Sequence, residues 1–174
     1  MFDCSRGAYD AAMFSVTVRS DTLSRALDRL AAGMDKPAPL MREIGHEMEV
    51  MAEQAFEKQG VLGGDQWERL APSTIERKAK AGKSRKLHMS GQLKASLHHG
   101  GDASRAFVGA GSGLSADYAA IHQFGGLAGK HRHITMPARP YLPFTGNGDS
   151  AELTPHAERA VIRLVEYYLK SLSR

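Results

Sequence analysis

Histidine is the residue type in this sequence best suited to site chemistry, because a neutral imidazole binds zinc. The sequence has eight histidines, among them the adjacent His98 and His99, the alternating His131 and His133, and His122 on an expected helix. Zinc requires three or four converging ligands. The spacing places no third ligand beside the alternating His131 and His133, so we expect neither a metal site nor a cofactor.

Other catalytic patterns are incomplete. His46-Glu47 lacks the second histidine of a zinc-protease motif, because Val50 occupies that position. Ser90 is not framed by the glycines of a nucleophile elbow. The glycine-rich stretch 109–113 is not followed by the Gly-Lys-Ser/Thr of a phosphate loop, so it is more simply a flexible turn. We therefore expect no enzymatic activity.

The composition is that of an ordinary globular domain. The chain has 174 residues, a net charge of +4 and 42% hydrophobic residues. Its single cysteine, Cys4, has no internal disulfide partner. The longest apolar runs fall short of the ~20 residues of a membrane span, and the N-terminus does not resemble a signal peptide. We expect synthesis in the cytosol and no membrane partner.

Positive charge is concentrated in the middle of the chain. Residues 69–105 contain nine basic and two acidic side chains, whereas residues 1–68 contain seven and twelve. Three interpretations stay open: a solvated mobile loop, contact with DNA phosphates, or contact with an acidic neighbouring protein. No aromatic residue for base stacking and no known DNA-reading motif accompanies the charge. The cations of this basic loop are Arg77, Lys78, Lys80, Lys83, Arg85 and Lys86.

Hydrophobic periodicity predicts the elements that must position these residues. Helices are expected from Ser20 or Asp21 to Met34, and over 40–57, 73–80, 116–124 and 151–172. Strands are expected over 13–19, 97–99, 106–109 and 133–136, with a stiff proline-containing loop over 137–142. Residues 92–97 fit either a short helix or an extended segment.

These elements predict an α+β fold: a small antiparallel sheet packed against two long helices, with a C-terminal amphipathic helix. Residues 13–174 are expected to form a single domain. Residues 1–12 are expected to be a disordered extension, and Met13 is a plausible alternative start.

Five short motifs occur in a fixed order between positions 67 and 142, and together they resemble the phage virion morphogenesis family, the tail-completion proteins of Mu-like and P2-like tailed phages. The motifs are Trp67-Glu68-Arg69-Leu70-Ala71-Pro72-Ser73-Thr74, Lys86-Leu87-His88-Met89-Ser90-Gly91-Gln92-Leu93-Lys94-Ala95-Ser96-Leu97, Val108-Gly109, Tyr118-Ala119-Ala120-Ile121-His122-Gln123-Phe124-Gly125-Gly126 and Met136-Pro137-Ala138-Arg139-Pro140-Tyr141-Leu142.

The resemblance implies a non-enzymatic structural protein of the virion neck or tail end, assembled in the host cytoplasm. It would complete the tail and join it to the head as an oligomeric ring, a hexamer by analogy with sixfold tails. The implied partners are other copies of the chain, the tail tube, head-connector proteins and genomic DNA passing through the lumen. The alternatives are a tail terminator, a head-completion factor, or a DNA-binding protein that uses the basic loop.

Within these motifs, Trp67 and Leu70 are expected to anchor the basic loop, and Arg139 to be an exposed cation on a stiff backbone that binds a neighbouring carboxylate. The alternative is that Arg139 pairs within its own chain. The C-terminal helix is expected to pack either on its own domain or on a neighbour. The candidate interface residues are His122, Phe124, Arg139, Pro140, Tyr141 and Tyr168.

Overall fold

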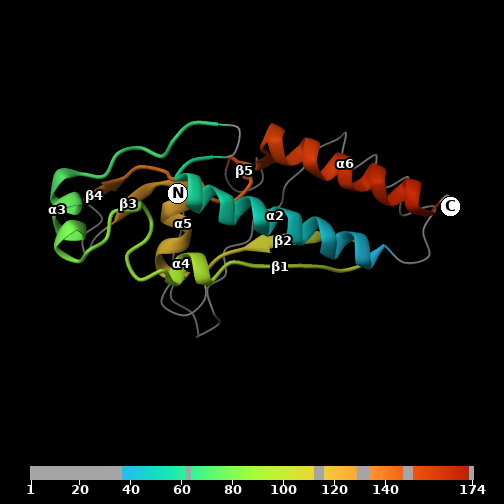
Figure 1. Cartoon of the computed structure of the whole chain (residues 1–174), viewed down its shortest axis with the longest axis horizontal. Coiled ribbons are helices and arrows are strands. Elements are labelled where there is room, and N and C mark those ends of the chain that lie inside the picture. Colours follow the sequence, from blue (N-terminus) through green and yellow to red (C-terminus); the bar gives the residue numbers. More distant parts are fainter. Residues whose placement is uncertain (1–36, 62–63, 112–115, 129–133, 147–150, 173–174) are drawn as a thin grey trace.

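The computed structural model describes residues 37–61, 64–111, 116–128, 134–146 and 151–172 (Figure 1). The expected extension 1–12, strand 13–19 and first helix lie outside the described residues, as do His131 and His133.

The described part of the chain consists of helices and short strands. The helices are α2 (Ala38–Lys58), α3 (Pro72–Lys80), α4 (Gln92–Ala95), α5 (Ala116–Phe124) and α6 (Pro155–Leu172). The strands are β1 (His98–Gly101), β2 (Ala106–Gly109), β3 (Gly126–Ala128), β4 (Ile134–Met136), β5 (Phe144–Thr145) and β6 (Glu152–Leu153). Residues 92–95 are thus helical, which settles the alternative that the sequence left open.

Among the described residues the strands form three separate two-stranded antiparallel sheets, where the sequence predicted one small sheet. The α+β class is confirmed. His98 pairs with Gly109 in the first sheet, Gly126 with Met136 in the second, and Phe144 with Leu153 in the third. Pro137 and Pro140 separate β4 from β5, because a proline cannot donate a ladder hydrogen bond.

Helix α2 is the longest element and follows the predicted apolar stripe. Its buried residues include all five that the periodicity placed inward: Leu40, Ile44, Met48, Met51 and Ala55. It begins after Pro37, and it ends where Gln59 adopts a left-handed conformation and donates its N–H to the Ala55 carbonyl.

Helix α6 packs antiparallel along α2 (Figure 1). Ala157 and Ala160, near the start of α6, contact Met51 in the later part of α2. Val161 and Val165 pack with the residues of the first turns of α2. The helix starts at Pro155 and not at 151, because residues 152–153 pair with β5, and Thr154 Oγ1 accepts the Ala157 N–H at 3.3 Å.

The hairpin β1–β2 lies close against α2 because a glycine on each element faces the backbone of the other. A Cβ on Gly45 would lie 2.5 Å from the Gly100 carbonyl oxygen, and one on Gly101 would lie 2.4 Å from the backbone of Met41. Met41, Gly45 and Glu49 occur at four-residue steps and therefore form one row on the helix. This row lies along β1.

We predict that Gly45→Ala destabilises the protein by about 1–3 kcal/mol, because the added methyl group meets backbone that cannot move aside cheaply. This clash outweighs the better helix propensity of alanine, which favours the variant by about 1 kcal/mol. Chemical denaturation measures the difference. Gln54→Ala, on the exposed face of the same helix, is the matched control and should be neutral or slightly stabilising. A Gly45→Ala protein as stable as the control would contradict the close packing.

Candidate assembly surface

Trp67 joins the segment before α3 to the proline-containing loop. Its side chain is buried and packs edge-on against Phe56, with 5.8 Å between ring centroids. Its Nε1 donates a hydrogen bond to the Pro140 carbonyl at 2.7 Å. Leu70, the second expected anchor, is half-buried.

Arg139 is buried and bonded within its own chain, so the prediction of an exposed cation is corrected. Its Nε donates to the Glu68 carbonyl at 3.4 Å and its Nη2 to the Arg69 carbonyl at 3.3 Å. The segment that follows Trp67 therefore covers the guanidinium. A direct role in binding a second subunit stays a prediction.

Gln123 of α5 holds the same loop from the other side. Its Oε1 accepts the backbone N–H groups of Tyr141 and Leu142, both at 3.0 Å, and its Nε2 donates to the Phe144 carbonyl at 3.3 Å. The hydroxyl of Tyr141 donates to the Ala119 carbonyl at 3.0 Å, and burial raises the pKa of Tyr141. Tyr141, a predicted interface residue, is thus a core residue here, whereas Pro140 is half-buried. The sequence did not single out Gln123.

His122 lies beside Gln123 and is mostly covered. Its carbonyl accepts the Arg139 N–H at 2.7 Å, while its buried Nδ1 has no hydrogen-bond partner among the described residues. Burial, and secondarily the positive charge of Arg139, lowers the pKa of His122. Its imidazole is therefore neutral at physiological pH.

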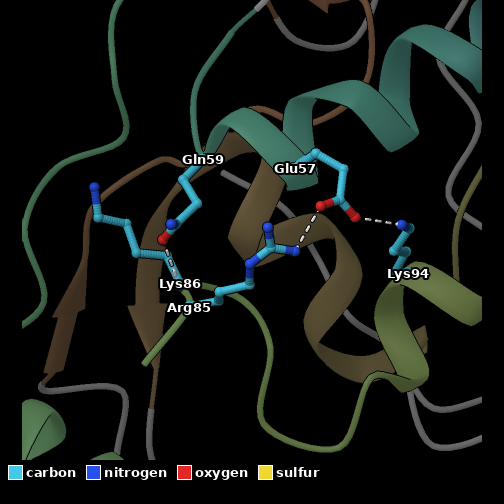
Figure 2. Close-up of polar contacts among 5 residues, drawn as sticks. All are labelled: Glu57, Gln59, Arg85, Lys86 and Lys94. Carbon is cyan, nitrogen blue, oxygen red and sulfur yellow. Dashed lines mark hydrogen bonds and ion pairs between the residues drawn. The ribbon is translucent and has the colours of Figure 1, made fainter. Parts of the chain in front are cut away.

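The basic loop is bonded to the domain at several points. Glu57, at the end of α2, accepts hydrogen bonds from Arg85 at 2.6 Å and Lys94 at 2.7 Å (Figure 2). The Lys86 N–H donates to Gln59 Oε1 at 2.8 Å, and its Nζ donates to the Trp67 carbonyl. The hydrogen bond from Lys94 and then that from Arg85 lower the pKa of Glu57 to about 2.

The remaining cations of the basic loop divide into two groups. Lys78 is buried and donates to the His88 carbonyl at 2.7 Å, and burial lowers its pKa. Lys80 pairs with Glu76 one turn earlier on α3, at 2.8 Å. Arg77 and Lys83 are exposed. Only part of the positive charge that the sequence concentrates here thus faces solvent freely.

Two other predicted interface residues pack on their own chain. Phe124 lies against the core beside Phe144, with 6.3 Å between ring centroids. Tyr168 packs on the cluster between α2 and α6. Its neighbour Tyr167 is instead 74% exposed.

The elements at the two ends of the molecule's long axis are α3, β3 and β4 at one end and the last turns of α6 at the other (Figure 1). Large apolar side chains are exposed on these elements. One group comprises Ile75 on α3, Leu127 on β3 and Ile134 on β4. We call it the hairpin-end patch. The other comprises Tyr167 and Leu169 near the end of α6, and we call it the helix-end patch.

The sequence matches the phage virion morphogenesis family over residues 18–170. The chain belongs to this family. It is also 34% identical over 150 residues to the Mu-like prophage FluMu G protein 2 of Haemophilus influenzae, covering 86% of this chain and 91% of that protein. No solved structure matches significantly.

Family membership confirms the resemblance seen in the sequence and gives the chain a role in the assembly of phage particles. In the described part of the chain, no helix has the length and apolar character needed to cross a membrane.

We predict that Gln123→Met destabilises the protein by at least about 3 kcal/mol. Methionine fills a similar volume but leaves two buried N–H groups and one carbonyl unpaired, each costing about 1–3 kcal/mol. Denaturant unfolding measures the loss. Gln54→Met on the exposed face of α2 is the matched control. Equal stability of the two variants would contradict the bonding role of Gln123.

His122 should make stability depend on pH. Because its folded-state pKa lies below the ordinary value of 6.5, the unfolded chain takes up the proton first. Stability is therefore fully present above pH 6.5 and is lost as the pH falls towards the lowered pKa. His122→Gln should flatten the unfolding free energy across this interval. Identical pH profiles for the two proteins would contradict a buried neutral imidazole.

Proposed function

We propose that the chain is a structural protein that completes the phage tail and joins it to the head as an oligomeric ring. The observation that carries this proposal is the presence of two different exposed apolar patches at opposite ends of one subunit. A contact between two unlike patches is heterologous, and it generates a ring when the rotation closes.

The hairpin-end patch presents exposed apolar side chains that a neighbouring subunit would cover. Leu127 pairs with Thr135 and Ala128 with Ile134, so Leu127 and Ile134 project from opposite faces of the β3–β4 hairpin. Both side chains are at least half exposed. A neighbouring subunit would bury both faces and thereby gain apolar contact area.

The helix-end patch is the proposed partner surface. Tyr167 combines a large apolar ring with a hydroxyl, which suits a contact that is apolar at its centre and wet at its rim. Tyr168 and Val165 fix this part of α6 against α2. The patch is thus carried on a firmly packed helix.

The bonded loops support a structural role over a catalytic one. The polar side chains of Gln123, Arg139 and Trp67 are used within the chain, where they fix the segments that precede α3 and follow α5. We propose that the chain is not an enzyme and that these bonds hold the hairpin end in one shape for assembly.

DNA binding by the basic loop is the second candidate, because Arg77 and Lys83 are exposed. Each neutralised phosphate contributes about 0.9 to the salt dependence of binding to duplex DNA. Two such cations per subunit give a weak contact for a monomer, whereas a ring multiplies them around a lumen. We therefore favour DNA contact as a consequence of assembly over DNA binding as the main activity.

The ring can be tested with two variants that place negative charges in the apolar patches. Leu127→Glu/Ile134→Glu disables the hairpin-end patch, and Tyr167→Glu/Leu169→Glu disables the helix-end patch. In sedimentation velocity, with and without isolated tail tubes, the wild-type chain should form a ring and each variant alone should stay monomeric. An equimolar mixture of the two variants should form a 1:1 dimer that grows no further, because only one intact pair of patches remains.

Phe107→Thr is the matched control, since Phe107 is an exposed apolar residue on β2 that belongs to neither patch. It should leave the ring intact. Rings formed by either double variant would overturn the proposed contact. Co-purification with isolated heads in place of tails would favour a head-completion factor, and a persistent monomer that shifts only with duplex DNA would favour the DNA-binding candidate.

A further inference from the structure

We propose that His46, Glu49 and His99 form a binding site for a divalent cation of the zinc class, between α2 and β1. The sequence placed no metal site here, and the proposal does not depend on ring assembly. The three residues offer two imidazole nitrogens and one carboxylate oxygen, and these ligand atoms all lie within 4.8 Å of one another.

The close approach of α2 to the hairpin creates this juxtaposition. Glu49 continues the helix row of Met41 and Gly45, which lies along β1. His99 and Gly101 are two residues apart on β1, so their Cα–Cβ directions share one face of the strand. Gly101 meets Met41 on that face, and His99 therefore reaches the same helix row further along, at Glu49.

The distances leave room for an ion after small side-chain rotations. His99 Nδ1 lies 2.7 Å from Glu49 Oε2, and His46 Nδ1 lies 4.0 Å from the same oxygen. The two imidazole rings are 5.1 Å apart and tilted by 53°. Ligands of a tetrahedral zinc at 2.0–2.1 Å stand about 3.4 Å from one another, which lies between these separations. A cation would replace the direct contact between His99 Nδ1 and Glu49 Oε2.

The ligand types select the class of ion. Imidazole suits zinc, cobalt and nickel, whereas magnesium and calcium prefer oxygen ligands throughout. The side chain of His46 is 55% exposed and that of His99 33% exposed, so an ion can enter from solvent. Three protein ligands leave a further coordination position for water. The bound ion would connect α2 to β1.

Cobalt titration of the tag-free, full-length protein, stripped of metal beforehand, tests the site. Visible absorption of Co²⁺ should reveal one bound ion per chain, displaced by Zn²⁺ and not by Mg²⁺. The unfolding temperature should rise with Zn²⁺ concentration, because a ligand that binds only the folded state stabilises it. His46→Asn, His99→Asn and Glu49→Gln should each weaken Co²⁺ binding by at least about tenfold, the smallest loss expected even for an outer-sphere partner.

His131→Asn/His133→Asn is the matched control, because it removes two imidazoles elsewhere in the chain and should leave Co²⁺ binding unchanged. His46→Asn alters a side chain that is mostly in solvent, so it reports on binding even if the other two variants fold poorly. The proposal is overturned if the wild-type chain binds no Co²⁺, if binding survives in His46→Asn, or if binding is lost in the control.

Discussion

The close approach of α2 to the β1–β2 hairpin is the constraint on which most of the described fold depends. Gly45 and Gly101 have no side chain, so the helix backbone can come within contact distance of the strand backbone. An adjacent side of α2 packs against α6 through Met48, Val161 and Val165, in a cluster that also includes Met41. A larger side chain at the glycine contact would push α2 away from the hairpin. The surface of α2 that α6 covers would then move as well.

A second set of contacts organises the other end of the molecule. The segment of Trp67, the end of α5 and the proline-containing loop meet through side chains that bond to backbone: Trp67 to Pro140, Arg139 to Glu68, and Gln123 to Tyr141. Prolines remove ladder donors from this loop, so side chains must supply the bonds that a sheet would otherwise provide. Three of the five motifs that carry the family resemblance, those containing Trp67, Gln123 and Arg139, therefore lie together as one bonded unit, next to the hairpin that we propose as a contact for a neighbouring subunit.

The local elements could be predicted from the sequence because their signals are local. The apolar steps of Leu40, Ile44 and Met48 predict α2, and the hairpin of residues 97–99 with 106–109 was also predicted. Its turn was expected at residues 100–102 but begins at Asp102, because Gly100 and Gly101 pair within β1. Strands β5 and β6 were missed because two residues each are too few to show an alternating pattern. The family could also be recognised from the order of its motifs, since that order is a property of the chain alone.

The sequence by itself determined the described helices other than α4, the α+β class and the family, all of which follow from periodicity and from the order of short motifs. Only the tertiary structure decided what Arg139, Lys78 and His99 contact. Arg139 meets a carbonyl 71 positions away, and His99 meets a carboxylate 50 positions away. Burial and charge pairing depend on which distant parts of the chain the fold brings together. In this protein the glycine contact and the proline-containing loop bring them together, and the spacing of residues along the sequence does not show this.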